Sequence, residues 1–308
     1  MKIGVLCGGV SSEREISLAS GEAVYQALLR NGCHAVRVDI VSADEAREQI
    51  LKTGIDFAFI ALHGFFGEDG RIQGILEEIG IPYSGSGVEA SRLAMDKART
   101  KGVLRGLGIM TPAGFVLKAH APHPAPDRLP VVVKPSDQGS SLGASIVHSK
   151  GEWDAALKNA SRFGGTVLVE DYISGEELTV GILEDGALPI VRLILKREFY
   201  DYQAKYEPGW TLYEVPASLE AGVARAVQEA ALKTHRAVGA SGFSRVDIRL
   251  DAQGSAWVLE LNTIPGFTDK SLLPKAAAQA GISFDDLVLK IIRYALEREM
   301  DAYKEQSA

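Results

Sequence analysis

The stretch VVVKPSDQGSSLGAS, residues 131–145, passes from β-branched residues through a lysine and a proline into a loop of small residues. β-branched residues favour a strand, and Lys134 stands near the end of that strand. A loop of consecutive small residues can point several backbone N–H groups at one anion. The stretch therefore predicts a strand-borne lysine beside an anion-binding loop, and an ordinary hairpin turn is the alternative.

The same loop matches the G-x-S-x-G pattern of serine hydrolases at residues 139–143. A nucleophile elbow needs a helix directly after the serine, whereas GASIVHS reads as a strand and residues 135–138 separate the loop from the strand before it. A Walker A loop is excluded because the lysine precedes the glycines and no GxxxxGK[ST] occurs. The remaining interpretation is a phosphate-binding loop that is neither a nucleophile elbow nor a Walker A loop.

Composition excludes several classes of function. The 308 residues are 46% hydrophobic and 24% charged, which suggests two or three globular domains. A net charge of −7 without a basic block argues against binding to nucleic acid or to an anionic membrane. The two cysteines form no CxxC pair, and no apolar run is long enough for a membrane span or a signal peptide. We expect a cytoplasmic protein.

Strands alternate with helices over roughly the first 90 residues, which predicts a parallel sheet covered on both faces. Ligands of such sheets lie beyond the carboxyl ends of the strands. Glu13 follows the first predicted strand and His63 ends the third. Ser12 and Glu15 match a capping box, which leaves Glu13 available for a ligand.

Two further patterns favour other interpretations only weakly. Gly85-x-Gly87-x-x-Ala90 is similar to a dinucleotide-binding fingerprint, but it stands late in its unit rather than after the first strand. His120 and His123 are spaced HxxH in a proline-rich segment that reads as a surface loop. The region beyond residue 95 reads as mixed or antiparallel sheet, unlike the N-terminal region.

The segment of residues 243–267 predicts a hairpin with its turn at 252–255. Arg245 and Asp247 lie two apart and so share a face, as do Glu260 and Asn262 on the return strand. Counting back from the turn places Asp247 opposite Glu260. Three such oxygen ligands suit Mg²⁺ that also holds ligand phosphates. The alternative is the solvated polar face of an edge strand.

Taken in order, the motifs of the chain closely resemble those of the D-alanine–D-alanine ligases, members of the ATP-grasp superfamily, over nearly all 308 residues. The motifs are GGVSSEREISLASG, ALHGFFGEDG, YSGSG, MDK, VVVKPSDQGSSLG, YDYQAKY, SRVDI, LELNTIPGFT and KSLLP. The resemblance implies an N-terminal parallel α/β domain followed by a two-module ATP-grasp fold of α+β type. We place these parts at residues 1–95, 96–180 and 181–308.

The resemblance implies a two-step reaction. The carboxylate of one D-alanine attacks the γ-phosphate of ATP, and the amine of a second D-alanine then displaces phosphate from the acyl phosphate. It also implies Mg²⁺ as cofactor, as two ions and with Mn²⁺ as an alternative, and a homodimer. The rival functions are a D-alanine–D-lactate ligase of the same fold, a Rossmann-type oxidoreductase and an inactive nucleotide-binding module.

Each implied role falls on a residue of this chain. The ATP-binding residues are Lys97, Lys134, Ser141, Glu170, Glu177 and Lys205. The metal ligands are Asp247, Glu260 and Asn262. The first D-alanine is met by Glu13 and His63, the second by Ser271 and Leu272, and the oxyanion by Arg245 and the amide of Gly266. Ser140 and Tyr206 complete the catalytic set.

Residues 197–213 carry six aromatic side chains, more than a permanently solvated loop usually holds. We expect this segment to cover bound ATP and exclude water. In it, Lys205 would reach the γ-phosphate, and the hydroxyl of Tyr206 would bond to Ser140, itself bonded to Glu13. Lys270 stands where some relatives carry histidine.

Overall fold

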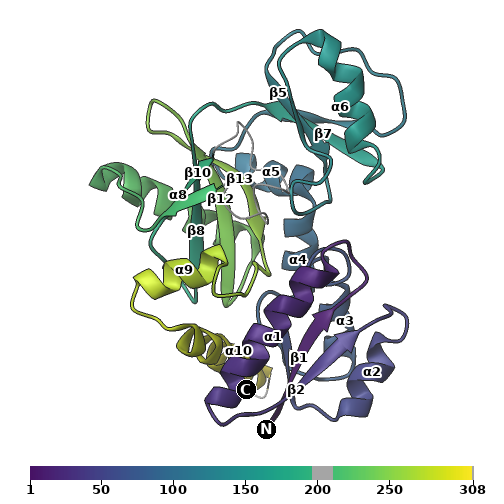
Figure 1. The fold of residues 1–308 in the computed structure, drawn as a ribbon, viewed down its shortest axis with the longest axis vertical. Helices are drawn as coiled ribbons and strands as arrows, with labels where there is room; N and C mark the ends of the chain where they lie inside the picture. Colours follow the sequence, from purple (N-terminus) through teal and green to yellow (C-terminus); the bar gives the residue numbers. More distant parts are fainter. Residues whose placement is uncertain (196–210, 307–308) are drawn as a thin grey trace.

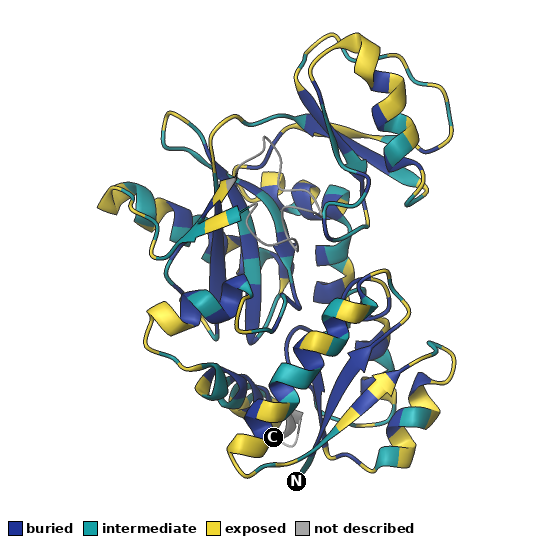
Figure 2. Cartoon of the chain, in the orientation of Figure 1, coloured by how far each residue is buried: buried dark blue, intermediate teal, exposed yellow. Residues whose placement is uncertain are grey.

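The computed structural model of the chain describes residues 1–195 and 211–306. Three sheets are stacked along the long axis of the molecule, each with helices beside it (Figure 1). Buried residues are concentrated in the interior strands, and many of the exposed residues lie on the outer helices and loops (Figure 2). None of the described helices is long and apolar enough to span a membrane.

The N-terminal sheet is parallel, as predicted, with strand order β2-β1-β3. Its strands are β1 (Lys2–Gly8), β2 (His34–Ile40) and β3 (Phe57–Ile60). The helices that connect and follow them are α1 (Arg14–Arg30), α2 (Ala46–Thr53) and α3 (Arg71–Glu78). The carboxyl ends of β1 and β3 both face the rest of the chain, which places Glu13 and His63 at that rim.

The start of α1 differs from the prediction. Glu13 occupies the N-cap position, and no side chain caps the helix, so the capping box of Ser12 and Glu15 is wrong. Instead, the hydroxyl of Ser11 accepts from the Glu13 N–H at 3.1 Å and donates to the carbonyl of His63 at 2.7 Å. Ser11 therefore ties the start of α1 to the end of the β3 segment.

The central sheet is antiparallel, with strand order β4-β7-β5-β6. Its strands are β4 (Gly114–Lys118), β5 (Val131–Pro135), β6 (Ser145–Val147) and β7 (Thr166–Asp171). The short helix η1 (Lys150–Glu152) and helix α6 (Trp153–Ala160) pack on it around a core of its own. The predicted strand that carries Lys134 is β5, and a strand rather than a helix follows the loop, as expected.

Two helices join the N-terminal and central sheets. They are α4 (Val88–Met95) and α5 (Lys97–Gly106). Asp96 interrupts them with an extended backbone (ψ 94°), and its carboxylate accepts from the Arg99 N–H at 3.1 Å. This cap fixes the direction in which α5 starts.

The C-terminal sheet has the order β11-β10-β8-β12-β13, and β9 pairs with β8. Its strands are β8 (Glu176–Leu183), β9 (Gly186–Ala187), β10 (Val191–Leu195), β11 (Thr211–Glu214), β12 (Phe243–Leu250) and β13 (Ala256–Asn262). Its helices are α8 (Ala221–Val238) and α9 (Leu272–Gln279). Because β8 starts at Glu176, this sheet begins ahead of residue 181.

The chain ends beside its beginning. Helix α10 (Phe284–Gln306) lies along α1 (Figure 1), and Arg30 pairs with Asp285 at 2.6 Å. One hydrophobic core contains residues of β1, β3 and α1 together with residues of α9 and α10. The N-terminal and C-terminal parts are therefore packed as one body, and the central sheet stands apart from it.

Candidate active site

Two adjoining cavities lie between the three sheets. The larger has a volume of about 440 Å³ and the smaller about 80 Å³. The predicted residues in the larger cavity are Glu13, His63, Lys97, Ser140, Arg245, Glu260, Asn262, Gly266, Ser271 and Leu272. Those in the smaller cavity are Lys97, Lys134, Ser141, Glu170, Glu177, Asp247 and Glu260. Lys97 and Glu260 line both, so the two cavities share a wall.

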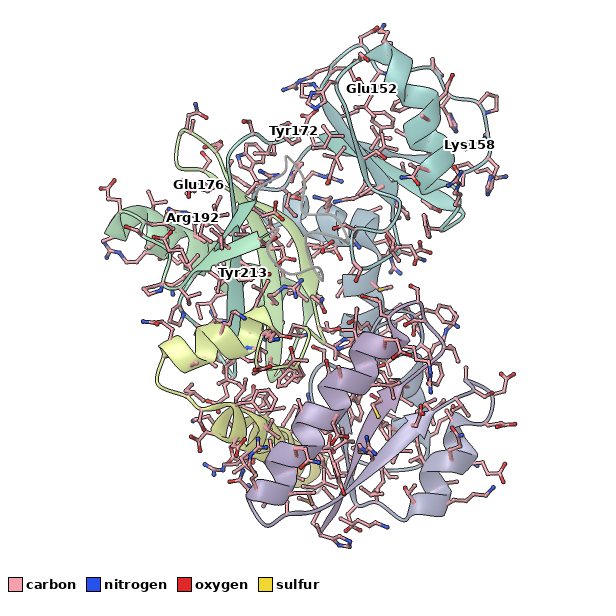
Figure 3. All side chains as sticks on the ribbon, in the orientation of Figure 1. Glu152, Lys158, Tyr172, Glu176, Arg192 and Tyr213 are labelled. Carbon is pink, nitrogen blue, oxygen red and sulfur yellow. The ribbon has the colours of Figure 1, made fainter. Side chains whose placement is uncertain are left out.

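The smaller cavity lies between the central and C-terminal sheets. Tyr172, which lines it, stands where the chain passes from one to the other (Figure 3). Lys134 on β5 reaches Glu170 on β7, with Nζ 2.5 Å from Oε1. Burial would raise the pKa of Glu170, but the nearby lysines outweigh it and hold that pKa below its ordinary value. Burial would likewise lower the pKa of Lys134, yet Glu170 and Glu260 raise it overall, so this lysine stays charged.

Glu177 enters the smaller cavity from β8. Arg249 on β12 lies opposite it in the sheet, and its Nη2 is 3.3 Å from Glu177 Oε2. Arg249 also donates to the carbonyl of Gly175 at 2.8 Å. The carboxylate is thus held at the cavity by a cation on the neighbouring strand.

The loop between β5 and β6 contributes residues to both cavities. Ser140 and Ser141 both have left-handed backbones, with φ of 52° and 56°, a conformation that costs energy for residues other than glycine and often marks functional sites. Lys97 Nζ donates to the carbonyl of Gln138 at 2.6 Å. The loop is therefore tied to α5 at one end, and its two serines face one cavity each.

The hairpin of β12 and β13 supplies the predicted metal ligands. Its register pairs Asp247 with Glu260 and Arg245 with Asn262, as the sequence predicted. A bulge between Asp247 and Ile248 lets Leu259 stand unpaired, and this shift makes Glu260 rather than its neighbour face Asp247. Hydroxyl Oγ1 of Thr179 donates to Asp247 at 2.6 Å. The carboxylates are therefore adjacent on one face.

These carboxylates already meet cations of the site. The guanidinium of Arg245 donates to both oxygens of Asp247, at 2.9 and 2.8 Å, and Lys97 Nζ lies 3.4 Å from Glu260 Oε2. No group of three or more His, Cys, Asp or Glu residues within residues 1–195 and 211–306 is arranged to hold a metal. Two carboxylates and the amide oxygen of Asn262 still suit Mg²⁺, which usually takes one or two carboxylates plus phosphate oxygens.

The carboxylate of Glu13 is closely surrounded by Ser140, Gly64 and Gly139. The hydroxyl of Ser140 donates to its carboxylate. A Cβ at Gly64 would lie 2.5 Å from Glu13 Oε2, and one at Gly139 would lie 3.0 Å from it. Gly64 also has a positive φ of 68°. Any side chain at these two positions would therefore press on the carboxylate, which is only 9% exposed.

His63 is fixed in one tautomer by its neighbours. Its Nδ1 faces the carbonyl of Ile264 at 3.0 Å, an acceptor, and so carries the proton. Its Nε2 then accepts from the hydroxyl of Ser20 at 3.0 Å, which in turn accepts from the Phe267 N–H at 3.1 Å. This chain connects α1, the end of β3 and the segment after β13.

Glu68 is a residue of the site that the sequence reasoning missed. It lines the larger cavity, with its Oε1 3.4 Å from His63 Nδ1. Burial raises the pKa of its carboxyl, and the negative charge of Glu13 adds to that effect, while the contact with His63 opposes it. The signal was its position five residues after His63 in HGFFGEDG.

The floor of the larger cavity is the start of α9. Ser271 is the N-cap of that helix and Leu272 its first residue. Hydroxyl Oγ of Ser271 accepts from the Thr268 N–H at 3.1 Å. The free N–H groups of a helix start attract anions, and Gly266 lies beside them. Tyr213 on β11 faces the same cavity (Figure 3).

Two predicted site residues, Lys205 and Tyr206, lie outside the described residues, as does most of the expected lid. The fingerprint-like loop serves packing: Arg298 donates to the carbonyl of Gly85 at 2.9 Å, and Gly85 abuts Phe243. It lines neither cavity. His120 and His123 border a separate open groove against α6.

Comparison with known proteins decides the family. The family model described as "D-ala D-ala ligase C-terminus" matches residues 121–293, and the one described as "D-ala D-ala ligase N-terminus" matches residues 37–86. A curated D-alanine–D-alanine ligase from Geotalea uraniireducens is 49% identical over 299 residues, covering 96% of this chain and 95% of that protein. The chain belongs to the D-alanine–D-alanine ligase family. The ligase of Syntrophotalea carbinolica is 48% identical, with 97% of each chain covered.

Solved structures of the D-alanine–D-alanine ligase family agree with this assignment. The Bacillus anthracis D-alanine–D-alanine ligase complexed with ATP superposes with a TM-score of 0.87 at 36% identity, covering 98% of this chain and 99% of that one. The expected fold class, an N-terminal α/β part followed by an ATP-grasp fold, is therefore confirmed. The oxidoreductase alternative is not supported.

Proposed function

We propose that the two cavities act as one active site that joins two D-alanine molecules to D-alanyl-D-alanine, with release of ADP and phosphate, for peptidoglycan precursor synthesis. One observation carries the proposal: Lys97 and Glu260 line both cavities and lie 3.4 Å apart. A phosphate leaving the smaller cavity would thus meet an acceptor in the larger one without crossing solvent. This continuity is what phosphoryl transfer between two bound substrates requires.

ATP occupies the smaller cavity, with its phosphates toward the shared wall. Lys97 and Lys134 bind the phosphates, the amide of Ser141 lies over them, and Glu177 binds the ribose. Glu170 faces the adenine amino group: each of its oxygens is paired with one lysine, Oε1 with Lys134 and Oε2 with Lys101, and a carboxylate oxygen can still accept a further N–H. Lys205 completes the phosphate site from the segment that would cover it.

Mg²⁺, as two ions, would be held by Asp247, Glu260 and Asn262, with Mn²⁺ as an alternative, and it supplies neutralisation of the charge on the phosphates. Arg245 and Lys97 pair with these carboxylates in the described structure. Binding of the nucleotide and metal would release both cations. Lys97 is then available to the phosphates and Arg245 to the reacting carboxyl group.

The first D-alanine binds at the carboxyl ends of β1 and β3. The carboxylate of Glu13, fixed by Ser140, binds its ammonium, and His63 lies near its carboxylate. One carboxylate oxygen attacks the γ-phosphorus of ATP, the bond to the bridging oxygen breaks, and ADP leaves. The product is an acyl phosphate in which that oxygen joins carbon to phosphorus.

The second D-alanine binds against the start of α9. Its carboxylate is held by the hydroxyl of Ser271 and the N–H of Leu272, at the positive end of the helix. Its amine, once deprotonated, attacks the acyl carbon, and Arg245 and the amide of Gly266 stabilise the oxyanion. The carbon–oxygen bond then breaks, and phosphate leaves with the former carboxylate oxygen. Tyr206 would extend the Glu13–Ser140 pair toward this amine.

Three broader assignments accompany this function. We assign residues 1–95 to the first-substrate part, residues 96–180 to the central ATP-grasp module, and residues 181–308 to the C-terminal module with the metal and second-substrate site. The protein acts in the cytoplasm, where its substrates arise, and as a homodimer. Sedimentation at several concentrations tests the last point, and a monomer at all of them contradicts it.

The test is ADP release measured with D-alanine, with L-alanine, and with D-alanine plus D-lactate. We expect ADP only when D-alanine is present, and dipeptide as the main product at neutral pH. ADP release independent of the amino acid would contradict ligation. A D-alanyl-D-lactate product in excess would instead favour the alternative ligase of the same fold.

A further inference from the structure

Lys101 is a buried charged residue to which the reaction above gives no task. It stands on α5 one turn after Lys97, so both lysines share a helix face. It is 1% exposed, which is rare for lysine unless the ammonium is paired. Its Nζ donates to Thr111 Oγ1 at 2.8 Å and forms an ion pair with Glu170 Oε2 at 2.8 Å.

The support of this lysine is rigid. The hydroxyl of Thr111 donates to the carbonyl of Val258 at 2.8 Å, so its oxygen is turned toward Lys101 as an acceptor. Val258 in turn donates its N–H to Met110 at 2.9 Å. Lys101 therefore joins α5, the segment before β4, strand β13 and strand β7.

Glu170 is shared between two lysines. Oε1 meets Lys134 and Oε2 meets Lys101, so the group of three carries a net charge of +1. A pair of Lys134 and Glu170 alone would be neutral, and in a buried site the carboxylate would hold that ammonium strongly. The second lysine divides the attraction of the carboxylate and restores positive charge beside the cavity.

We propose that Lys101 is a positioning residue for the nucleotide: it holds one oxygen of Glu170, fixes that carboxylate at the cavity wall and leaves Lys134 able to bind a phosphate. Lys101 does not line either cavity, so it acts through Glu170. The proposal rests on the proposed function in one respect, since it takes the smaller cavity as the nucleotide site.

The protonation of Lys101 should make nucleotide binding depend on pH. Burial lowers the pKa of Lys101 to about 8, Glu170 on β7 and Glu260 on β13 oppose that shift, and Lys134 on β5 adds to it. Lys97 is the nearest lysine on its own helix. A bound polyphosphate favours the charged form, so binding above pH 8 should take up a proton. Nucleotide affinity should therefore fall between pH 7 and pH 9.

The experiment is calorimetric titration with a non-hydrolysable ATP analogue and Mg²⁺, at pH 7 and pH 9, in buffers of different ionisation enthalpy. Lys101→Met keeps the length of the side chain and removes the charge, and exposed Lys158 on α6 provides the control Lys158→Met. We expect Lys101→Met to bind about tenfold more weakly at pH 7, an ordinary size for coupling between groups. We expect Lys101→Met to bind the analogue with the same affinity at pH 7 and at pH 9. Its binding at pH 9 should take up no proton.

Steady-state kinetics separates positioning from a general loss of structure. The KM for ATP should rise in Lys101→Met, while the KM for D-alanine stays within about twofold of the wild-type value. A variant that melts at a lower temperature but binds the analogue like the wild type would overturn the proposal. Wild-type protein that binds no nucleotide would contradict the proposed function instead.

A second experiment tests the proposal without Lys101→Met, in case that variant does not fold. The wild-type protein alone must lose affinity and take up protons between pH 7 and pH 9. Thr111→Val removes the neutral acceptor of Lys101 and should move that loss to lower pH. Equal affinity at both pH values in the wild type would overturn the proposal.

Discussion

The two cavities hold their charged groups in different ways. In the smaller one, Lys134 and Glu170 stand on paired strands of the central sheet and Glu177 stands on β8 of the C-terminal sheet, and each is paired with an opposite charge. In the larger one, Glu13, His63 and Ser140 come from loops of different parts of the chain and are held by hydroxyl and backbone groups. Strand register positions the first set, whereas loop contacts position the second.

This difference indicates a division of tasks. A nucleotide brings several negative charges, so a rigid, precharged wall suits it. An amino acid brings an ammonium and a carboxylate close together, and selecting it depends on a few directional contacts. Substitutions on the strand side should therefore reduce turnover or nucleotide affinity, and those on the loop side should change amino-acid affinity or product choice.

The largest expected effect lies at the shared wall. Glu260→Gln keeps the shape of the side chain but removes a charge that balances Lys97 and that, in the proposed function, would hold the metal. We expect kcat to fall by about 100-fold or more, the size found when one electrostatic stabiliser is removed. The measurement is ADP release at saturating Mg²⁺, with Glu229→Gln on the exposed face of α8 as control. Near-normal turnover would show that this carboxylate serves neither the metal nor the phosphates.

On the loop side, Glu13→Gln should mainly affect D-alanine. The neutral amide loses the charge that, in the proposed function, would bind the ammonium, and hydrogen bonds to charged groups contribute about 1.5–3 kcal/mol. We expect the KM for the first D-alanine to rise by about 10- to 100-fold and the KM for ATP to stay nearly constant. A rise in the KM for ATP of the same size would remove the distinction between the two cavities.

His235 is a buried titratable residue outside both cavities, so its protonation should affect the stability of the fold. Burial lowers the pKa of His235 on α8 from 6.5 to about 4, and its Nδ1 bonds to Ser244 Oγ at 2.7 Å. The unfolded chain binds more protons between these pH values, so stability should fall as the pH drops from 6.5 toward 4. We expect a loss of about 1–2 kcal/mol between pH 7 and pH 5.

Urea unfolding of the wild type and of His235→Gln at pH 7 and at pH 5 measures this loss of stability. The variant keeps a hydrogen-bonding group but cannot titrate, so its stability should change less over the same range. If both proteins lose the same stability, other groups account for the pH dependence.

The smallest expected effect is on product choice. Tyr206→Phe keeps the ring and removes the hydroxyl that would extend the Glu13–Ser140 pair toward the second substrate. We expect the D-alanyl-D-lactate fraction to rise a few-fold when D-alanine and D-lactate compete, most at low pH where the amine is protonated. A product ratio equal to the wild-type value from pH 6 to 8.5 would make Tyr206 a packing residue.

The sequence predicted the strand side better than the loop side, for a physical reason. Alternation along β12 and β13 places side chains on one face or the other, so Asp247 and Glu260 follow from counting once the turn is located. The count succeeds because two departures cancel: next to the turn the strands pair one residue away from the predicted register, with Leu250 opposite Ala256, and the bulge at Leu259 restores the pairing of Asp247 with Glu260. Lys134 likewise follows from the β-branched run before it.

The residues that sequence reasoning missed act through tertiary contacts. Glu68 and Lys101 look like ordinary helix or loop charges until the fold buries them beside His63 and Glu170. The capping box at Ser12 and Glu15 failed because Ser11 binds across the loop instead, and the break at Asp96 came from a cap inside a helical pattern. Local propensity depends on neighbouring residues in the sequence and therefore does not predict these competing contacts.

In the proposed reaction, a carboxylate in the larger cavity attacks a phosphate in the smaller one. The most direct measurement uses D-alanine labelled with ¹⁸O in both carboxylate oxygens and follows the label by mass spectrometry of the inorganic phosphate. An acyl phosphate transfers one carboxylate oxygen to phosphate for every dipeptide formed, so we predict one ¹⁸O in each phosphate released. Unlabelled phosphate, formed together with dipeptide, would show that the carboxylate does not attack the phosphate.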